Sequence, residues 1–348
     1  PMHAVGRRPA FRAPARGFTV VELMVAMTVG LLVLGTVAVV FAATSRNRTT
    51  LERSARLIEN AQYTLDLLRS EITQAGYYDT LTTSIVTWRV PDPCATALGD
   101  LGWSVPGTSP SSAPASIVDA PVPISGLRGA DATPACTPDR KPDTAMLVVR
   151  YVGPAATARA SASGAPYLQL SKCASDVANV QNLGVIASKP ADFTLHNIDC
   201  ASFADVKRYV SRTYYVASCN RCGIDTIPTL KRAEFDGDAI VVTPVAEGIE
   251  NLQIEYGIDA NNDGTPDRYL ESVDPALGPA FGQWANVMAV RLYLLARSTS
   301  VEPGYQDVTK QFNLGPAGYT AVAGDGYKRT LLTSVVRPMG PAGQRELP

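Results

Sequence analysis

An unbroken apolar run near the amino terminus is the strongest pattern in the sequence. Residues 23–43 contain no charged side chain. As an α-helix, which rises about 1.5 Å per residue, this run would span about 31 Å, close to the roughly 30 Å hydrocarbon core of a bilayer. The pattern therefore predicts one membrane-spanning helix over residues 18–44.

A stripe of apolar positions continues beyond this run, through a segment that is otherwise polar. The stripe predicts that the helix extends over residues 45–78 with one face packed on a core, and Gly76 is expected to end it. A free coiled coil is the alternative, but the short pattern and the Gly-Tyr-Tyr that follows it favour docking on a sheet. The apolar residues recur every seven positions at Leu51, Ile58, Leu65 and Ile72, with Ala61, Leu68 and Ala75 on the adjoining position.

Residues 79–348 have the pattern of a strand-rich head. Residues from about 91 to 143 are rich in Pro, Ser, Ala and Gly, which predicts a long irregular surface loop. No alternation of strands with long helices occurs, so the expected fold class is α+β with a mostly antiparallel sheet. Runs separated by Gly, Pro and Asp turns predict strands over 144–152, 166–171, 193–198, 208–217, 239–242, 249–257, 287–297 and 330–336.

The segment before the apolar run is short and basic. Residues 1–17 contain four arginines and no acidic residue. By the positive-inside bias this leader stays in the cytoplasm, which predicts a single-pass protein of the inner membrane with its head in the periplasm. A secretory signal cut after Ala43 is the alternative, but its apolar region would be shorter and would not contain Glu22.

The junction between leader and apolar run resembles the type IV prepilin signal. Residues 17–23, GFTVVEL, place a small residue, a Phe and a Glu in the order of that signal, directly before a membrane span. The resemblance implies that a prepilin peptidase cuts after Gly17 and methylates the new amino terminus, Phe18. It also implies that Glu22 neutralises the amino terminus of an adjoining subunit, because opposite charges attract strongly at low dielectric constant.

Four segments of the head resemble the PilW-type minor pilins, namely 212–216, 228–232, 245–257 and 284–298. The resemblance implies a pilin fold, in which the upper half of the long helix lies across an antiparallel sheet. It implies a role in pilus assembly and priming and incorporation into the extracellular pilus. The expected partners are other minor and major pilins, a tip adhesin, the prepilin peptidase and the inner-membrane assembly platform. A minor pseudopilin of a type II secretion system shares these features and is the alternative.

Residues 259–267 resemble the start of a calcium-binding loop. Oxygen-bearing side chains at alternate positions, followed by a Gly at the turn, can converge on one hard cation. The twelfth position of the loop holds Leu270, however, where a bidentate Glu is expected. An Asx-rich hairpin turn is the alternative. The candidate calcium ligands are Asp259, Asn261, Asp263, Thr265 and Asp267.

All six cysteines lie beyond the membrane segment. An even number of cysteines on the exported side indicates disulfides. Many connectivities are possible, and we choose Cys94–Cys136, Cys173–Cys200 and Cys219–Cys222. The last two cysteines could instead supply two zinc ligands, but the fold would have to provide the other two.

The composition argues against catalysis and against nucleic-acid binding. The only histidines are His3 and His196, and no G-x-S-x-G, H-E-x-x-H or phosphate-loop motif occurs. Without the four arginines of the leader, 27 of the 31 basic residues face 32 acidic ones, a net charge of about −5. Duplex binding needs clustered basic residues instead. We therefore expect no enzyme activity, no cofactor other than calcium and no nucleic-acid partner.

Overall fold

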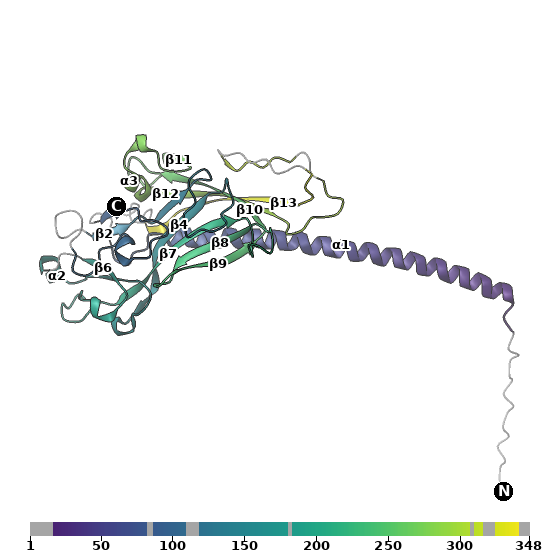
Figure 1. Cartoon of the computed structure of the whole chain (residues 1–348), viewed down its shortest axis with the longest axis horizontal. Coiled ribbons are helices and arrows are strands. Elements are labelled where there is room, and N and C mark those ends of the chain that lie inside the picture. Colours follow the sequence, from purple (N-terminus) through teal and green to yellow (C-terminus); the bar gives the residue numbers. More distant parts are fainter. Residues whose placement is uncertain are drawn as a thin grey trace, which may run out of the picture. The chain divides into compact units, whose positions relative to one another are not determined.

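The computed structural model describes residues 17–81, 86–108, 118–179, 183–306, 310–315 and 324–340. By its contacts the chain divides into two compact units, Pro1–Glu52 and Arg53–Pro348. The helix α1 (Val20–Gln74) begins in the first unit and ends in the second (Figure 1). The two parts of this helix differ in exposure.

The first part of α1 exposes apolar side chains on every face. All side chains of residues 18–45 are exposed. By length and composition, α1 is the one helix among the described residues that could cross a membrane. A helix that is apolar all round suits a lipid environment better than water. The long apolar helix predicted from the sequence is therefore present.

The second part of α1 buries one face. The predicted stripe is correct in its later turns and wrong at its start, since Leu51 and Ile58 are 69% and 49% exposed. A straight α-helix drifts by about 20° for every seven residues, so a strict seven-residue line leaves the packed face over several turns. The buried apolar side chains of this face are Leu57, Ala61, Leu65, Leu68, Ile72 and Ala75.

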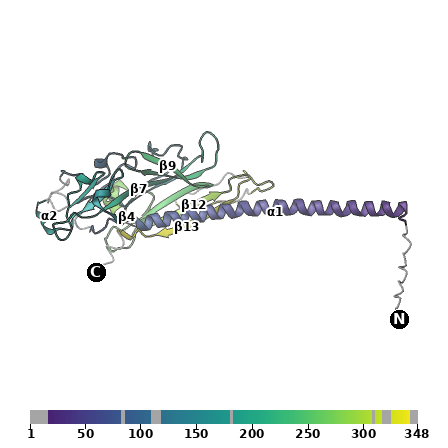
Figure 2. The same cartoon turned by 90° about the horizontal axis from the view of Figure 1, so that it is seen from below.

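Gly76 follows the last turn of α1, as the sequence predicts. Its φ of 78° lies in the left-handed region, which glycine adopts without strain. The Gly76 amide donates to the Arg150 carbonyl oxygen at 2.9 Å, and the Val152 amide donates to the Tyr77 carbonyl oxygen at 2.8 Å. These bonds attach the end of α1 to strand β4 (Met146–Thr157), which lies beside it in Figure 2.

The larger sheet is antiparallel and centres on β7 (Val206–Ala217). One edge of β7 pairs with β4. The other edge pairs first with β5 (Tyr167–Leu170) and then with β8 (Thr229–Phe235). The outer strands are β3 (Ile124–Leu127), β6 (Gly184–Ala187) and β9 (Ile240–Glu247).

The smaller sheet is also antiparallel. Its strand order is β11 (Arg268–Leu270), β10 (Ile249–Ile258), β12 (Val287–Arg297) and β13 (Arg329–Val336). Two further strands, β1 (Val86–Arg89) and β2 (Val118–Pro121), pair in parallel outside both sheets. The short helices are α2 (Ala174–Asn179) and α3 (Ala280–Ala285), with 3-10 turns at Leu98–Asp100, Arg159–Ser161, Pro190–Asp192 and Pro275–Leu277. The α+β fold class is confirmed.

The described residues of the segment 91–143 are irregular over most of their length, as the composition predicts, but they are not a surface loop throughout; residues 109–117 lie outside the described residues. The segment contains β2 and β3, whose residues are buried except for the half-buried Leu127. The strands β1, β6, β8 and β11 are also absent from the sequence prediction. Of these, β6 is buried throughout and lacks the alternating pattern by which exposed strands are detected, while β1 and β11 are only four and three residues long.

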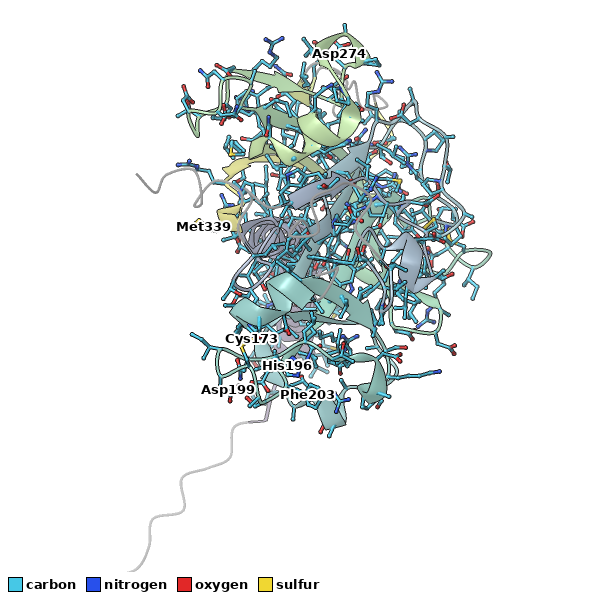
Figure 3. All side chains as sticks on the ribbon, turned by 90° about the vertical axis from the view of Figure 1, so that its left-hand side faces the viewer. Cys173, His196, Asp199, Phe203, Asp274 and Met339 are labelled. Atoms are coloured by element: carbon cyan, nitrogen blue, oxygen red, sulfur yellow. A yellow bond between two sulfur atoms is a disulfide. The ribbon has the colours of Figure 1, made fainter. Side chains whose placement is uncertain are left out.

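The predicted strand over residues 193–198 is absent from this described segment, which holds only an isolated bridge between His196 and Phe203 (Figure 3). A side chain takes the place of a neighbouring strand there. Gln169 Oε1 accepts from the Leu195 amide at 3.0 Å, and Gln169 Nε2 donates to the Leu195 carbonyl oxygen at 3.1 Å. The backbone polar groups are thereby satisfied without a ladder.

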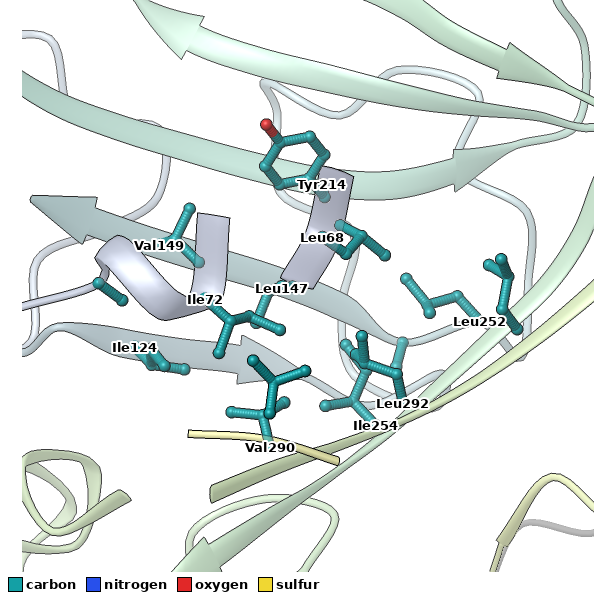
Figure 4. Packing of buried hydrophobic residues seen from close by; sticks show 14 of the residues in the cluster. Leu68, Ile72, Ile124, Leu147, Val149, Tyr214, Leu252, Ile254, Val290 and Leu292 are labelled. Atoms are coloured by element: carbon teal, nitrogen blue, oxygen red, sulfur yellow. The ribbon is translucent and has the colours of Figure 1, made fainter. Parts of the chain in front are cut away.

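One large core packs the second part of α1 against both sheets. Leu68 and Ile72 of α1 join one cluster with Leu147 of β4, Ile254 of β10 and Val290 of β12, as Figure 4 shows. Each sheet therefore buries its inner face partly on the helix, which is the layered arrangement that α+β domains use.

Buried charged groups accompany this packing. Glu71 of α1 is 4% exposed and accepts from Arg212 Nη1 of β7 at 2.7 Å. Arg212 Nε donates to Glu234 Oε2 of β8 at 2.9 Å. Burial would lower the pKa of Arg212, but the bonds to Glu234 and the charge of Glu71 raise it. The guanidinium therefore stays charged and joins the helix to two strands.

The substitution Leu68→Ala should lower the free energy of unfolding by about 2–5 kcal/mol, because it leaves a cavity between helix and sheets. Ile58→Ala is the matched control on the same helix and should change it by about 0.5 kcal/mol. Urea unfolding of the full chain in a neutral detergent, followed by circular dichroism, measures both. Equal losses would show that the packed face is not the one described.

Candidate functional site

The first turn of α1 is closed by reciprocal bonds between Thr19 and Glu22. The Thr19 amide and hydroxyl each donate to Glu22 Oε2 at 2.9 Å, and the Glu22 amide donates to Thr19 Oγ1 at 3.3 Å. This arrangement is a capping box, with Thr directly before the helix and Glu three residues later. The Thr-x-x-Glu spacing in the sequence could have predicted it.

The predicted processing site lies directly before this turn. Gly17 and Phe18 are exposed and precede Val20, the first residue of α1. The first backbone bond of the helix runs from the Leu23 amide to the Thr19 carbonyl oxygen at 3.1 Å. The peptide bond after Gly17 is therefore outside the helix, between two exposed residues. Cleavage and methylation at this bond stay predictions.

The carboxylate of Glu22 has partners only within its own turn. Among the described residues it bonds to Thr19 alone, and it is exposed on a surface of apolar side chains. A carboxylate offers about four acceptor positions, so the capping bonds leave room for a cationic partner. An acidic residue at the centre of a membrane helix costs roughly 3 kcal/mol, less near the interface. A positive charge beside Glu22 would offset that cost.

The candidate calcium loop is held together by its own amides. Asp259 is buried, with Oδ1 accepting from the Asn262 amide at 2.7 Å and Oδ2 from the Gly264 amide at 2.9 Å. Asp263 Oδ1 accepts from the Thr265 amide at 2.8 Å. These are the local bonds by which Asp closes turns. These bonds are those of an Asx-rich turn, which the sequence analysis gave as the alternative to a calcium-binding loop.

The other candidate ligands of this loop are also engaged. Asp267 Oδ2 accepts from the Ala260 amide at 2.7 Å, and Asn261 Nδ2 donates to Asp263 Oδ2 at 3.0 Å. Among the described residues, the loop contains no three carboxylates whose oxygens lie within 4.8 Å of one another. Each of these carboxylates keeps acceptor positions beyond its amide bonds, and calcium binding stays a prediction.

The six cysteines form three disulfides. The structure joins Cys94 to Cys136, Cys173 to Cys200 and Cys219 to Cys222, the same pairs as those chosen from the sequence. Bonded to each other, Cys219 and Cys222 do not offer the thiolates that zinc requires. Asp139, whose carboxylate lies close to both sulfurs, therefore does not complete a metal site with them.

His196 faces a carboxylate without forming a catalytic triad. Its Nδ1 lies 3.1 Å from Asp176 Oδ1, and its ring stacks on Phe203 with centroids 5.3 Å apart. Ser171 Oγ donates to the same Asp176 carboxylate, whereas in a triad the serine donates to the histidine. The group connects the end of β5 to the segment around the Cys173–Cys200 disulfide.

Two families match parts of the chain. The prokaryotic N-terminal methylation motif matches residues 12–38, and type IV pilus-assembly protein W (PilW) matches residues 213–337. The two matches support a type IV pilin-like protein of the PilW type. Both resemblances stated from the sequence are thereby confirmed, and the second match covers the end of β7 and all strands from β8 to β13. The motif and the apolar α1 fit a membrane-anchored pilin, and the PilW family is structural rather than enzymatic.

Among solved structures, the chain is similar to a type IV-like pilin from Thermus thermophilus, with 13% sequence identity and a TM-score of 0.36. The alignment covers 82% of this chain and 97% of that chain. A similarity of this size adds no argument beyond the family matches. The search of curated proteins found no match.

A melting experiment separates the two interpretations of the Asp259 loop. If calcium binds, Asp263→Ala should lower the melting temperature only when calcium is present, because binding to the native state stabilises it. Asp259→Asn should lower it with and without calcium, because the loop amides lose a charged acceptor. Identical wild-type melting temperatures in calcium and in chelator would contradict calcium binding.

Proposed function

We propose that this protein is a minor pilin that takes part in priming the assembly of a type IV pilus. The observation that carries the proposal is the carboxylate of Glu22, which is exposed at the start of an uncharged apolar helix and bonded only to Thr19. Helix bundling in a filament places this carboxylate at low dielectric constant, where a neighbouring ammonium group attracts it strongly. Cleavage after Gly17 by a prepilin peptidase would supply that ammonium group at Phe18, which the same enzyme methylates.

The size of the head supports a minor subunit rather than a major one. Two sheets and three disulfides follow α1, and the PilW match lies entirely within this head. The proposed partners are other minor and major pilins, a tip adhesin and the inner-membrane assembly platform. The head stands in the periplasm before the subunit enters the extracellular pilus.

A minor pseudopilin of a type II secretion system is the second candidate, because it would use the same helix and processing site. Deletion of the gene distinguishes the two. Loss of surface pili with normal secretion of exoproteins supports the pilus role. Loss of secretion with normal piliation supports the pseudopilin role.

Glu22→Ala should leave membrane insertion intact and reduce incorporation into sheared filaments by at least about tenfold, equivalent to about 1.4 kcal/mol. Thr19→Ala is the matched control. It removes the capping hydroxyl, at a cost of about 1 kcal/mol to the helix, and keeps the carboxylate, so it should incorporate nearly normally. Immunoblots of membrane and filament fractions give both quantities. Normal incorporation of Glu22→Ala would refute pairing through this residue.

A further inference from the structure

The Cys219–Cys222 disulfide lies in the connection between β7 and β8. Its cysteines are three residues apart, whereas those of the other two pairs are 27 and 42 residues apart. A disulfide constrains the unfolded chain less when it closes a shorter loop, so this bond contributes the least of the three to folding. Its two sulfurs also differ in access, because Cys219 is only 7% exposed and Cys222 is not buried.

The backbone of this connection is held in place independently of the disulfide. Asp225 Oδ1 accepts from the Asn220 amide at 2.8 Å, and Oδ2 accepts from the Arg221 amide at 2.7 Å. These are local bonds by which Asp fixes a turn. Asn220 Nδ2 in turn donates to Glu247 Oε1 of β9. If the bond between the sulfurs opened, the two cysteines would therefore stay close together and the bond could form again.

A buried lysine faces the more accessible sulfur. Lys231 lies in β8, which pairs with β7 and β9, and it is 8% exposed. Among the described residues, its ammonium group makes one hydrogen bond, from Nζ to Cys222 Sγ at 3.4 Å. Sulfur is a weak acceptor, so this bond compensates poorly for the burial of a charge. A thiolate at the same position would compensate better, because it carries the opposite charge.

A carboxylate near the same sulfurs acts in the opposite direction. The oxygen of Asp139 lies within 4.8 Å of both sulfurs, and its negative charge would disfavour a thiolate. Asp139 is exposed, however, so water and salt screen its charge more than that of the buried Lys231. The balance favours the thiolate. Stabilisation of a reduced form makes a disulfide easier to reduce.

We propose that Cys219–Cys222 is a redox-active disulfide that exchanges with dithiols, with Cys222 as the exchanging sulfur and Lys231 as the group that stabilises its thiolate. One thiolate of the dithiol attacks Cys222 Sγ. The electron pair of the broken sulfur–sulfur bond passes to Cys219, which takes up a proton from water. The second thiolate then attacks the dithiol sulfur that is bound to Cys222. Cys222 leaves as a thiolate beside Lys231, and the dithiol is oxidised to a disulfide.

Reduction at equilibrium tests the reactivity of this pair. The oxidised full chain, in a neutral detergent with a chelator, is equilibrated with mixtures of reduced and oxidised dithiothreitol. Acid quenching, alkylation and peptide mass spectrometry give the reduced fraction of each disulfide. The equilibrium constant for reduction of Cys219–Cys222 should exceed those of the other two pairs by at least about tenfold, equivalent to about 30 mV. Reduction of this pair together with the others or after them would overturn the proposal.

Charge variants test the role of Lys231. Lys231→Met should lower that equilibrium constant about tenfold, and Lys231→Arg should keep it near the wild-type value, because arginine retains the charge. Asp139→Asn should raise it about threefold, because it removes the opposing charge. The melting temperatures of the oxidised variants show that they are folded. An equilibrium constant that Lys231→Met leaves unchanged would overturn the proposal.

Single-cysteine variants identify the exchanging sulfur. Cys219→Ser leaves the accessible Cys222 thiol, and Cys222→Ser leaves the buried Cys219 thiol. Oxidised glutathione should form a mixed disulfide with Cys219→Ser at least about tenfold faster than with Cys222→Ser. Equal rates, or a faster reaction of Cys222→Ser, would contradict the assignment of Cys222. The proposal rests on the head and does not use the role of the chain in pilus assembly, so a failure of the Glu22 experiment would leave it standing.

Discussion

The head depends on the burial of one face of α1. Leu68 and Ile72 are fully buried in a cluster that contains strands of both sheets, so each sheet uses the helix to cover apolar side chains. Burial of a leucine or isoleucine side chain contributes roughly 1.5–3 kcal/mol. Because the apolar run belongs to the same continuous helix, the element that fits the membrane also completes the core of the head. Changes to the packed face therefore affect more than local helix stability.

Apolar side chains could still pack if α1 shifted slightly along the sheets. The buried ion pairs would break on such a shift, so they oppose it. Glu71, Arg212 and Glu234 come from α1, β7 and β8, and the bonds that join them have definite lengths and directions. Removal of one partner would leave an uncompensated charge in a buried position, which is strongly unfavourable. A displaced helix would have the same consequence. These groups thus select one register of helix and sheets among several that would bury similar apolar area.

Patterns that repeat over many residues could be predicted from the sequence, and features set by tertiary contacts could not. The apolar run, the end of α1 at Gly76 and the long strands β7, β10 and β12 follow from periodicity and turn residues. β2 and β3 do not, because they are short and buried among residues whose composition suggests a loop. The heptad line fails at Ile58 because the packed face of a straight helix drifts away from a strict seven-residue repeat, and Leu57 is buried there instead. At the candidate site, the order Gly17, Phe18, Glu22 is visible in the sequence, but the engagement of the Asp259 loop by its own amides requires coordinates.

The capping box changes how the charge of Glu22 should be understood. A bare carboxylate would make a lone subunit expensive to keep in the membrane, and pairing in a filament would then be nearly irreversible. The bonds from Thr19 satisfy part of the carboxylate before any neighbour arrives. In the proposed filament, pairing with an amino terminus would therefore recover only the remaining part of the cost. A contribution of that reduced size would favour one axial position of neighbouring helices without trapping a wrongly placed subunit, and the larger apolar surface of α1 would supply the rest of the association energy.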